Sequence, residues 1–434
     1  MDTAIVLFTR DLRLHDNPAL AGACARARQV VPLFVVDPAL TVPPNRARFL
    51  ADSLAVLQQE LREHGGDLMI RKGDPVAEVI RLATQTAARA VFVAGDVSRY
   101  AARREQRLVR ECGRHRIALD VTPGHAVVPA GDLQPSGRGG HYRVFTPYWR
   151  AWRAAAWREP CQAPEAVSVP AGIEPGDLPV PDKGSSADLM SGGEWAGRDR
   201  ATAWLDGSMK TYGDRRDLLA SDETSRLSAY LRFGCVSPLA LARAAPPLPG
   251  GEEFCRQLAW RDFFHQVMAA FPDIATEDYR PGLHGTRNWA EDPDALDAWR
   301  AGRTGIPVVD AGMRQLIAEG FMHNRARMIT ASFLTRTLGL DWRHGYGHFR
   351  ELLADGDVAC NAGNWQWVAG TGNNPRPGRV LNPLRQAVRF DTDGDYVRRY
   401  VPELASLAAP YIHTPWQLPD AQRRQLNYPD PLGV

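Results

Sequence analysis

The sequence predicts an N-terminal α/β domain built on a parallel sheet, followed by a larger domain made only of helices. In the first 128 residues, short β-branched or apolar runs alternate with helical segments, a pattern typical of parallel sheets. From about residue 197 onward, apolar residues recur at helical spacing and strand-like runs are few. Between these two regions the periodicity disappears. These three observations define the fold class.

The expected strands are short and alternate with helical segments. Five strands are predicted at residues 5–8, 30–36, 68–70, 91–94 and 119–121, and helices near 47–64, 75–88 and 101–115. Parallel α/β sheets bind their ligands at the carboxyl ends of the strands. No Gly-x-Gly-x-x-Gly segment follows the first strand, so a nucleotide would need another binding device there.

A long connector is predicted between the two domains. Residues 129–196 are rich in Pro, Gly and Ser, and only an aromatic-rich helix at residues 145–157 interrupts them. We therefore expect an α/β domain at residues 1–128, a linker at 129–196 and a helical domain at 197–434.

Composition excludes several classes of protein. The 434 residues carry a net charge of only +2, so any nucleic-acid site must be a local patch. The six cysteines show no Cys-x-x-Cys or Cys-x-x-His spacing, which argues against a metal site or a disulfide framework. The N-terminus does not resemble a signal peptide, and no run of 18 apolar residues occurs. We expect a cytoplasmic monomer without metal or membrane contact.

The most informative region combines charges, amides and indoles within a helical pattern. On a helix from about residue 357 to 368, Asp357, Asn361 and Trp365 share one face, and Trp367 lies about 200° around from Trp365. Polar groups are costly inside a core unless they have a partner, so this face predicts a polar ligand. The alternative is that Asp355 only caps the helix and the tryptophans fill the core.

The preceding helix repeats this arrangement. Asn324, Arg327 and Met328 share a face at spacings of three and four residues. Arg327 and Asp355 are therefore candidates for an ion pair. No Ser-His-Asp arrangement, catalytic cysteine or metal cluster is evident in the sequence.

Several longer segments, in a fixed order along nearly the whole chain, resemble the photolyase/cryptochrome family. They are DLRLHDN at 11–17, TSRLS at 224–228, WRDF at 260–263, GIPVVDAGMRQL at 305–316, MHNR at 322–325, DGD at 355–357 and WQW at 365–367. The resemblance is strongest to bacterial class I cyclobutane pyrimidine dimer photolyases. It implies a Rossmann-like antenna domain, a crossing linker and a larger all-α FAD-binding domain. It also implies light-driven repair of UV-damaged DNA, by electron transfer from photoexcited reduced FAD to a flipped-out cyclobutane pyrimidine dimer.

Residues 224–228 place hydroxyls and a cation where an apolar helix opens. Helix N-termini attract anions, so this segment suits a diphosphate, although an ordinary helix cap would look the same. The resemblance assigns to FAD the residues Tyr212, Thr224, Ser225, Arg226, Leu227, Ser228, Arg327, Asp355, Asp357 and Asn361. Arg327 and Asp355 would lie beside the isoalloxazine, Asp357 at its pyrimidine edge and Asn361 at N5, where an amide can donate or accept.

The resemblance also implies a pocket for the lesion. Damaged bases are less costly to flip out, and aromatic side chains can stack on them. The implied pocket residues are Gln257, Trp260, Asn324, Arg325, Met328 and Trp367. Arg325, Arg376 and Arg379 are expected near its mouth as phosphate contacts.

One departure concerns which lesion is repaired. Gln257 stands where cyclobutane-dimer photolyases commonly carry Glu, and Gln is also found there in (6-4) photolyases and in close bacterial relatives. Asn324 and Met328 occupy positions where (6-4) enzymes have histidines. Cyclobutane dimers are therefore favoured, and a (6-4) photoproduct photolyase stays an alternative.

Two further assignments come from the resemblance. Trp289, Trp342 and Trp365 match the three-tryptophan chain that carries an electron to the flavin during photoreduction. Arg46 and Asp96 match contacts to an antenna chromophore, although an ion pair or a helix cap would explain each equally well. We expect 8-hydroxy-5-deazaflavin as the antenna; methenyltetrahydrofolate, or no antenna, is the alternative.

Two functions from other classes remain open. A cryptochrome would signal through a partner after absorbing blue light, without repairing DNA. A flavin electron-transfer protein would have no use for Trp260, Trp367 and Met328 in an open pocket. Repair is the function that the whole set of residues favours.

Overall fold

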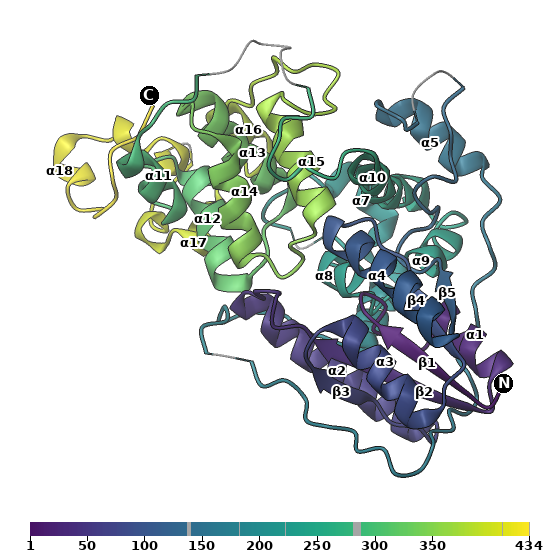
Figure 1. Ribbon diagram of the computed structural model, residues 1–434. Helices are drawn as coiled ribbons and strands as arrows, with labels where there is room; N and C mark the ends of the chain where they lie inside the picture. Colours follow the sequence, from purple (N-terminus) through teal and green to yellow (C-terminus); the bar gives the residue numbers. More distant parts are fainter. Residues whose placement is uncertain (137–139, 182, 222, 281–287, 410, 434) are drawn as a thin grey trace. The chain divides into compact units, whose positions relative to one another are not determined.

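The computed structural model describes residues 1–434 except 137–139, 182, 222, 281–287, 410 and 434 (Figure 1). The chain divides into two compact units. Unit 1 contains Met1–Gly184, Met190–Lys210 and Ser225–Pro272, and unit 2 contains Ser185–Leu189, Thr211–Thr224 and Asp273–Val434. These limits differ from the predicted domains, because Ser225–Pro272 groups with the sheet and not with the later helices.

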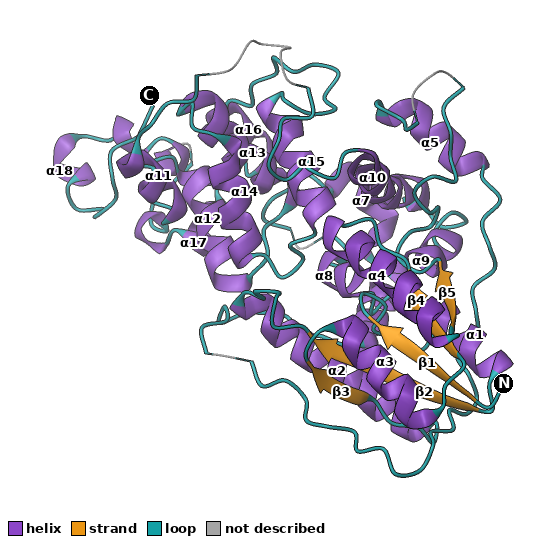
Figure 2. Ribbon diagram, in the orientation of Figure 1, coloured by secondary structure: helices purple, strands orange, loops and turns teal. Residues whose placement is uncertain are grey.

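Unit 1 is built on a five-stranded parallel sheet with the order β3-β2-β1-β4-β5 (Figure 2). The strands are β1 (Thr3–Phe8), β2 (Gln29–Val36), β3 (Met69–Lys72), β4 (Ala90–Ala94) and β5 (Ala118–Thr122). All five overlap the predicted segments, which confirms the parallel α/β prediction. The strand order reverses between β1 and β4, and ligands of such sheets bind at this switch point.

Helices cover both faces of the sheet. They are α1 (Pro18–Arg26), α2 (Pro44–Glu63), α3 (Pro75–Thr86) and α4 (Arg99–His115). Ile5 and Leu7 of β1 join a buried cluster with apolar side chains of α3 and α4. Phe92 of β4 points the other way and meets Gly22 of α1. Strand side chains alternate between the two faces, so both faces carry apolar residues.

Capping residues explain where several of these helices begin. Asn17, Asp74 and Ser98 each accept a hydrogen bond from a backbone N–H in the first turn of the helix that follows. Proline occupies the first position of α1 and α3, where no N–H is needed. Each of these boundaries is thus marked by a cap whose backbone partner lies within the first turn.

The other helices of unit 1 are α5 (Phe145–Ala154), α6 (Glu194–Asp206), α8 (Ser228–Phe233), α9 (Pro238–Ala244) and α10 (Gly251–Ala270). Buried Asp262 of α10 holds three distant groups together. Its Oδ2 accepts hydrogen bonds from the backbone N–H of Val127 and Val128 and from Nε1 of Trp152 on α5, at 3.0, 3.1 and 2.9 Å. Burial raises the pKa of this carboxyl, and Arg261 opposes the shift.

In the part of the chain that the structure describes, unit 2 contains helices and loops but no strand. Its α-helices are α7 (Tyr212–Arg215), α11 (Pro293–Arg300), α12 (Pro307–Glu319), α13 (Asn324–Ser332), α14 (Trp342–Leu352), α15 (Val358–Ala369), α16 (Pro383–Phe390), α17 (Asp395–Tyr400) and α18 (Asp420–Arg423). A π-helical turn, η2 (Phe333–Thr337), extends α13. Short 3-10 turns are η1 (Ser208–Thr211), which bridges the two units in sequence, η3 (Pro402–Leu404), η4 (Tyr411–His413) and η5 (Pro415–Gln417).

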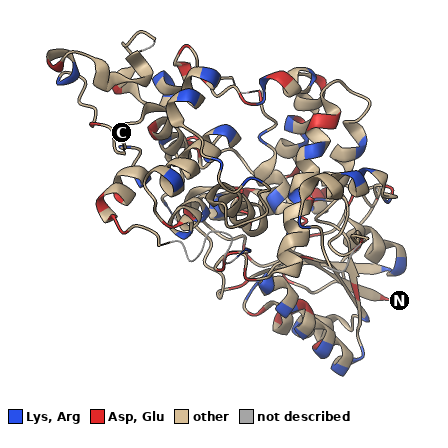
Figure 3. Cartoon of the chain, turned by 90° about the horizontal axis from the view of Figure 1, so that it is seen from above, with Lys and Arg blue, Asp and Glu red and all other residues tan. Residues whose placement is uncertain are grey.

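The distribution of charged residues agrees with the small net charge of the sequence. Lys and Arg lie interspersed with Asp and Glu along the helices (Figure 3). Among the described helices, none combines the length and the apolar character that crossing a bilayer requires.

Candidate functional site

The predicted ion pair is present between Arg327 of α13 and Asp355, which lies shortly before α15. The guanidinium of Arg327 donates to both carboxylate oxygens of Asp355, at 3.2 and 2.7 Å. Its Nε also donates to the backbone carbonyl of Met322 at 2.8 Å, which fixes the direction of the side chain. Both charged groups are largely buried, with side-chain exposures of 26% and 11%. A two-pronged pair of this kind has a defined geometry as well as favourable energy.

The start of α15 differs from the expected one by a residue. Asp357 is the cap, since its Oδ1 accepts from the backbone N–H of Cys360 at 2.9 Å, and the helix begins at Val358. The alternative interpretation, in which Asp355 caps the helix, is therefore wrong. The carboxylate of Asp355 pairs with Arg327 instead. Asp357 is also buried, so its carboxylate lies within the protein and not in solvent.

Asn361 lies one turn further along α15. Its Nδ2 donates to the backbone carbonyl of Tyr346 on α14 at 3.2 Å. This bond orients the amide and leaves Oδ1 available as an acceptor. The predicted face of Asp357, Asn361 and Trp365 is thus present on α15.

Trp365 and Trp342 are brought together by α14. The indole of Trp365 lies directly over Gly345, where an added Cβ would come within 2.0 Å of its Cη2 atom. Trp342 is three residues before Gly345, so it lies on the same side of α14. Both tryptophans are buried. The backbone N–H of Ala290, next to Trp289, donates to Gly339 just before α14, at 2.9 Å. All three predicted tryptophans therefore belong to one region of unit 2.

Residues predicted for the lesion pocket differ in exposure. Asn324 is exposed at the start of α13, and its Nδ2 lies 4.0 Å from the sulfur of Met328 one turn later. Trp367 is half-buried on α15, and its Nε1 is buried without a hydrogen-bond partner. An unpartnered buried donor is uncommon and points to a missing acceptor.

Arg325 differs from the expected open cation. Its guanidinium pairs with Asp217 at 2.6 Å and lies 4.5 Å from the ring centre of Phe390, and only 14% of its side chain is exposed. Arg376 and Arg379, in contrast, are exposed in the loop after α15. Arg376 and Arg379, unlike Arg325, are therefore exposed cations of unit 2.

Two of the predicted lesion residues lie on α10 in unit 1. The indole of Trp260 stacks on Phe145 with ring centres 3.7 Å apart and planes 6° from parallel, so one of its faces is covered. It also meets the edges of Phe263 at 5.5 Å. Gln257, one turn before Trp260, is partly buried, and its Nε2 lies 3.4 Å from the carbonyl of Glu253.

The segment predicted to bind diphosphate precedes α8, as expected. The helix begins at Ser228, and Arg226 has a left-handed backbone with φ of 48°. The carbonyl of Ser225 accepts from Nε of Arg200 at 2.8 Å. Tyr212 and Thr224 belong to unit 2, and burial raises the pKa of Tyr212 to about 12.

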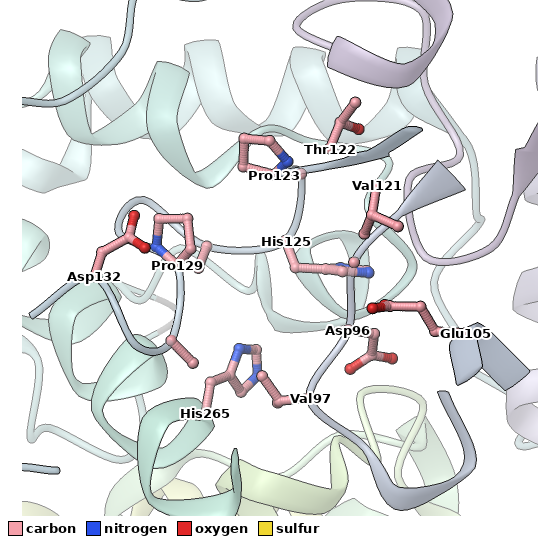
Figure 4. A pocket seen from close by; sticks show the side chains of 14 residues that line it. Asp96, Val97, Glu105, Val121, Thr122, Pro123, His125, Pro129, Asp132 and His265 are labelled. Carbon is pink, nitrogen blue, oxygen red and sulfur yellow. The ribbon is translucent and has the colours of Figure 1, made fainter. Parts of the chain in front are cut away.

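A pocket of about 420 Å³ lies at the carboxyl ends of β4 and β5 (Figure 4). Asp96, Glu105, His125 and His265 are among the residues that line it. Asp96 pairs with Arg10 at 3.3 Å and accepts from the N–H of Ser98. Burial alone would raise the pKa of Asp96, but the charge of Arg10 holds it below its usual range.

Both antenna predictions can be located in unit 1. Asp96 lies between β4 and α4 and forms an ion pair with Arg10, as one alternative supposed, whereas the cap of α4 is Ser98. Arg46, near the start of α2, is buried.

Comparison with known proteins supports the family. A family model described as DNA photolyase matches residues 4–166, and one described as the FAD-binding domain of DNA photolyase matches residues 254–433. A deoxyribodipyrimidine photo-lyase from Streptomyces griseus is 52% identical and covers 100% of this chain and 96% of that protein. The chain belongs to the photolyase/cryptochrome family.

Solved photolyase structures have the same fold. A bacterial class III photolyase from Agrobacterium tumefaciens has a TM-score of 0.94 at 33% identity, over 100% of this chain and 95% of that chain. A Synechocystis cryptochrome has a TM-score of 0.89 at 29% identity, over 100% and 97% of the two chains. A cryptochrome DASH from Natronomonas pharaonis is 37% identical over 100% of this chain and 98% of that protein. The chain is thus a member of a family whose proteins carry the names photolyase and cryptochrome.

FAD is the cofactor of the matched C-terminal domain. Arg327 of α13, the buried carboxylates of Asp355 and Asp357 just before α15, and Asn361 on α15 supply polar atoms that suit such a group.

Two residues that position this photolyase site were not predicted. Gly345 leaves the space that the indole of Trp365 occupies. A glycine within a predicted helix could have indicated such a close contact. Gln366 is fully buried, and its Nε2 donates to the carbonyls of Ile274 and Glu277, at 2.7 and 2.8 Å. No local pattern could reveal those partners, because they lie about 90 residues away in sequence.

Proposed function

We propose that this protein is a deoxyribodipyrimidine photo-lyase that repairs cyclobutane pyrimidine dimers in DNA. The observation that carries the proposal is the 52% identity, over the whole chain, to a relative of that name. The largely buried pair of Arg327 and Asp355 supports it, because such a pair suits a site for a polar cofactor.

Four residues would hold the flavin part of FAD. Arg327 and Asp355 would flank it as a neutral, fixed pair, Asp357 would accept hydrogen bonds at a ring edge, and Asn361 would offer its Oδ1. When bound, FAD supplies light absorption and one-electron chemistry. The protein's contribution is to bind, orient and exclude water, so no general acid or nucleophile is required.

The DNA-facing residues would act by shape and stacking. Trp260 and Trp367 would each offer an indole to the flipped-out bases, at about 1–3 kcal/mol per stacked base. Asn324 and Met328 form a mixed polar and apolar surface on α13. Gln257 would donate an amide hydrogen bond to a pyrimidine carbonyl. We include Arg376 and Arg379 as phosphate contacts because they are exposed.

Photoreduction of FAD would use Trp365, Trp342 and Trp289. The close approach of Trp365 to α14, one turn from Trp342, supports this route. Replacing Trp365 by Phe should slow photoreduction of the oxidised protein, while repair by chemically reduced protein continues. Equal photoreduction rates in the variant and the parent would count against the route.

We further propose an antenna chromophore in unit 1, with 8-hydroxy-5-deazaflavin preferred over methenyltetrahydrofolate. Buried Arg46 and the Asp96 carboxylate are its proposed contacts. Protein produced together with deazaflavin synthesis should gain an absorption band that an Arg46→Ala variant loses.

The deciding experiment is repair of an oligonucleotide with a single thymine cyclobutane dimer, under blue light, by protein whose FAD is chemically reduced. A dark sample and a Trp367→Ala variant are the controls. Light-dependent restoration that the variant lacks supports the proposal. If reduced, FAD-loaded protein restores nothing, the same test with a (6-4) lesion separates a different substrate from a cryptochrome role, which the cryptochrome relatives would then favour.

A further inference from the structure

We propose that Asp278 sets the direction of electron transfer between Trp342 and Trp365, by stabilising positive charge on Trp342. Trp342 is fully buried, and its Nε1 donates to Oδ1 of Asp278 at 2.9 Å. The carboxylate is therefore in contact with the indole that would carry the charge. This inference rests on the proposed photoreduction route and not on the identity of the lesion.

The charges around Trp342 do not cancel. Arg343 donates to the same Oδ1 of Asp278 at 2.9 Å, and its guanidinium lies 4.7 Å from the ring centre of Trp342. Arg343 also pairs with Asp341 through two contacts of 3.1 Å. Among the described residues that make these contacts, two carboxylates and one guanidinium leave one net negative charge beside the indole. A negative charge in direct hydrogen-bond contact makes an indole easier to oxidise.

Trp365 has a different setting. Its indole is buried against the rings of Phe349 and Trp299, with centres 4.9 and 6.1 Å away, and against the backbone at Gly345. Positive charge is costly in such apolar surroundings. A radical cation on Trp365 is therefore higher in free energy than one on Trp342. This difference favours movement of the positive charge from Trp365 to Trp342, away from the cofactor.

The step balances as a single electron transfer. FAD, when bound and excited by light, would supply the oxidant for Trp365, and the oxidised Trp365 would then take one electron from Trp342. Trp365 returns to its neutral form and Trp342 becomes a radical cation. No covalent bond forms or breaks, and the proton stays on Nε1 within its hydrogen bond to Asp278. Asp278 is a positioning residue, because it acts through Trp342.

The test is laser-flash absorption of FAD-loaded protein, which measures the yield of long-lived tryptophan radical. Asp278→Asn keeps an acceptor for Nε1 but loses the charge, and we expect at least a five-fold loss of yield. Asp278→Glu should recover most of it. Glu277→Gln removes a charge from the neighbouring, exposed position and should leave the yield unchanged.

Arg343→Gln separates an electrostatic role from a structural one. It disturbs the same hydrogen-bond network but removes the opposing positive charge, so the yield should stay equal or rise. Equal losses in Asp278→Asn and Arg343→Gln, or no loss in Asp278→Asn, overturn the inference. If Trp342→Phe keeps the full yield, the photoreduction route is wrong and the inference fails with it. FAD content and the unfolding midpoint of each variant show whether the fold is intact.

Discussion

The contact between Gly345 and Trp365 allows a sharp test of how the site is built. A Cβ at residue 345 would lie 2.0, 2.4 and 2.6 Å from three carbons of the Trp365 indole, whereas ordinary contacts are 3.4–4 Å. The rigid indole would have to retreat by more than an ångström. Phe349 and Trp299 pack against its other sides and oppose that movement.

The magnitude follows from two opposing effects. Overpacking a well-packed core costs about 1–3 kcal/mol, and this overlap belongs at the upper end. Replacing glycine by alanine inside a helix gains about 1 kcal/mol. We therefore expect Gly345→Ala to lower the free energy of unfolding by about 2 kcal/mol. Because the indole is displaced, photoreduction of FAD should slow as well.

Gly347, on the same helix, is a matched control. Nothing lies within 4 Å of a Cβ added there, so Gly347→Ala should raise stability by about 1 kcal/mol through helix propensity alone. Urea unfolding followed by circular dichroism compares the two variants under identical conditions. If Gly345→Ala is as stable as Gly347→Ala, Trp365 does not pack on α14 as described, and the proposed tryptophan route loses its structural basis.

Three further predictions concern other parts of the chain. Burial, followed by the like charge of Glu194, raises the pKa of Glu60 from about 4.5 to about 8, so the native state holds a proton that the unfolded state releases. The free energy of unfolding should then fall as pH rises from about 5 to 8. Glu60→Gln should flatten this slope and add on the order of 2–4 kcal/mol at pH 8. If urea unfolding gives the same pH dependence of this free energy for parent and variant, the prediction is wrong. Replacing Arg376 and Arg379 together by Gln should reduce the salt dependence of DNA binding by a slope of about 2, as measured by titration at several salt concentrations; an unchanged slope would place the phosphate contacts elsewhere. Asp262→Ala leaves three buried donors without an acceptor and should cost about 3 kcal/mol or more in thermal or urea unfolding, which a variant of native stability would disprove.

Local patterns were sufficient for the sheet and for the ends of its helices. The β-branched runs that became β1, β2 and β4 are fully or mostly buried, so burial and propensity favour the same state. Caps such as Asp74 act within one turn, and their partners are therefore visible in sequence. The boundary between the two units was harder to predict from the sequence. Asp262 bonds to backbone groups about 135 residues away, and such contacts assign α10 to the sheet.

The candidate site divides in the same way. Arg327 and Asp355 were predictable because a carboxylate buried beside a helix needs a partner of opposite charge, and Arg327 was a candidate in the sequence. Asp278 was not, because it lies in a loop, and its importance comes only from the Nε1 atom that it meets. The polar residues on one face of a helix recur at helical spacing, so the sequence shows them. The residues that modify the properties of such groups come from distant parts of the chain. Only the folded structure shows that Asp278, among many carboxylates, contacts the indole of Trp342.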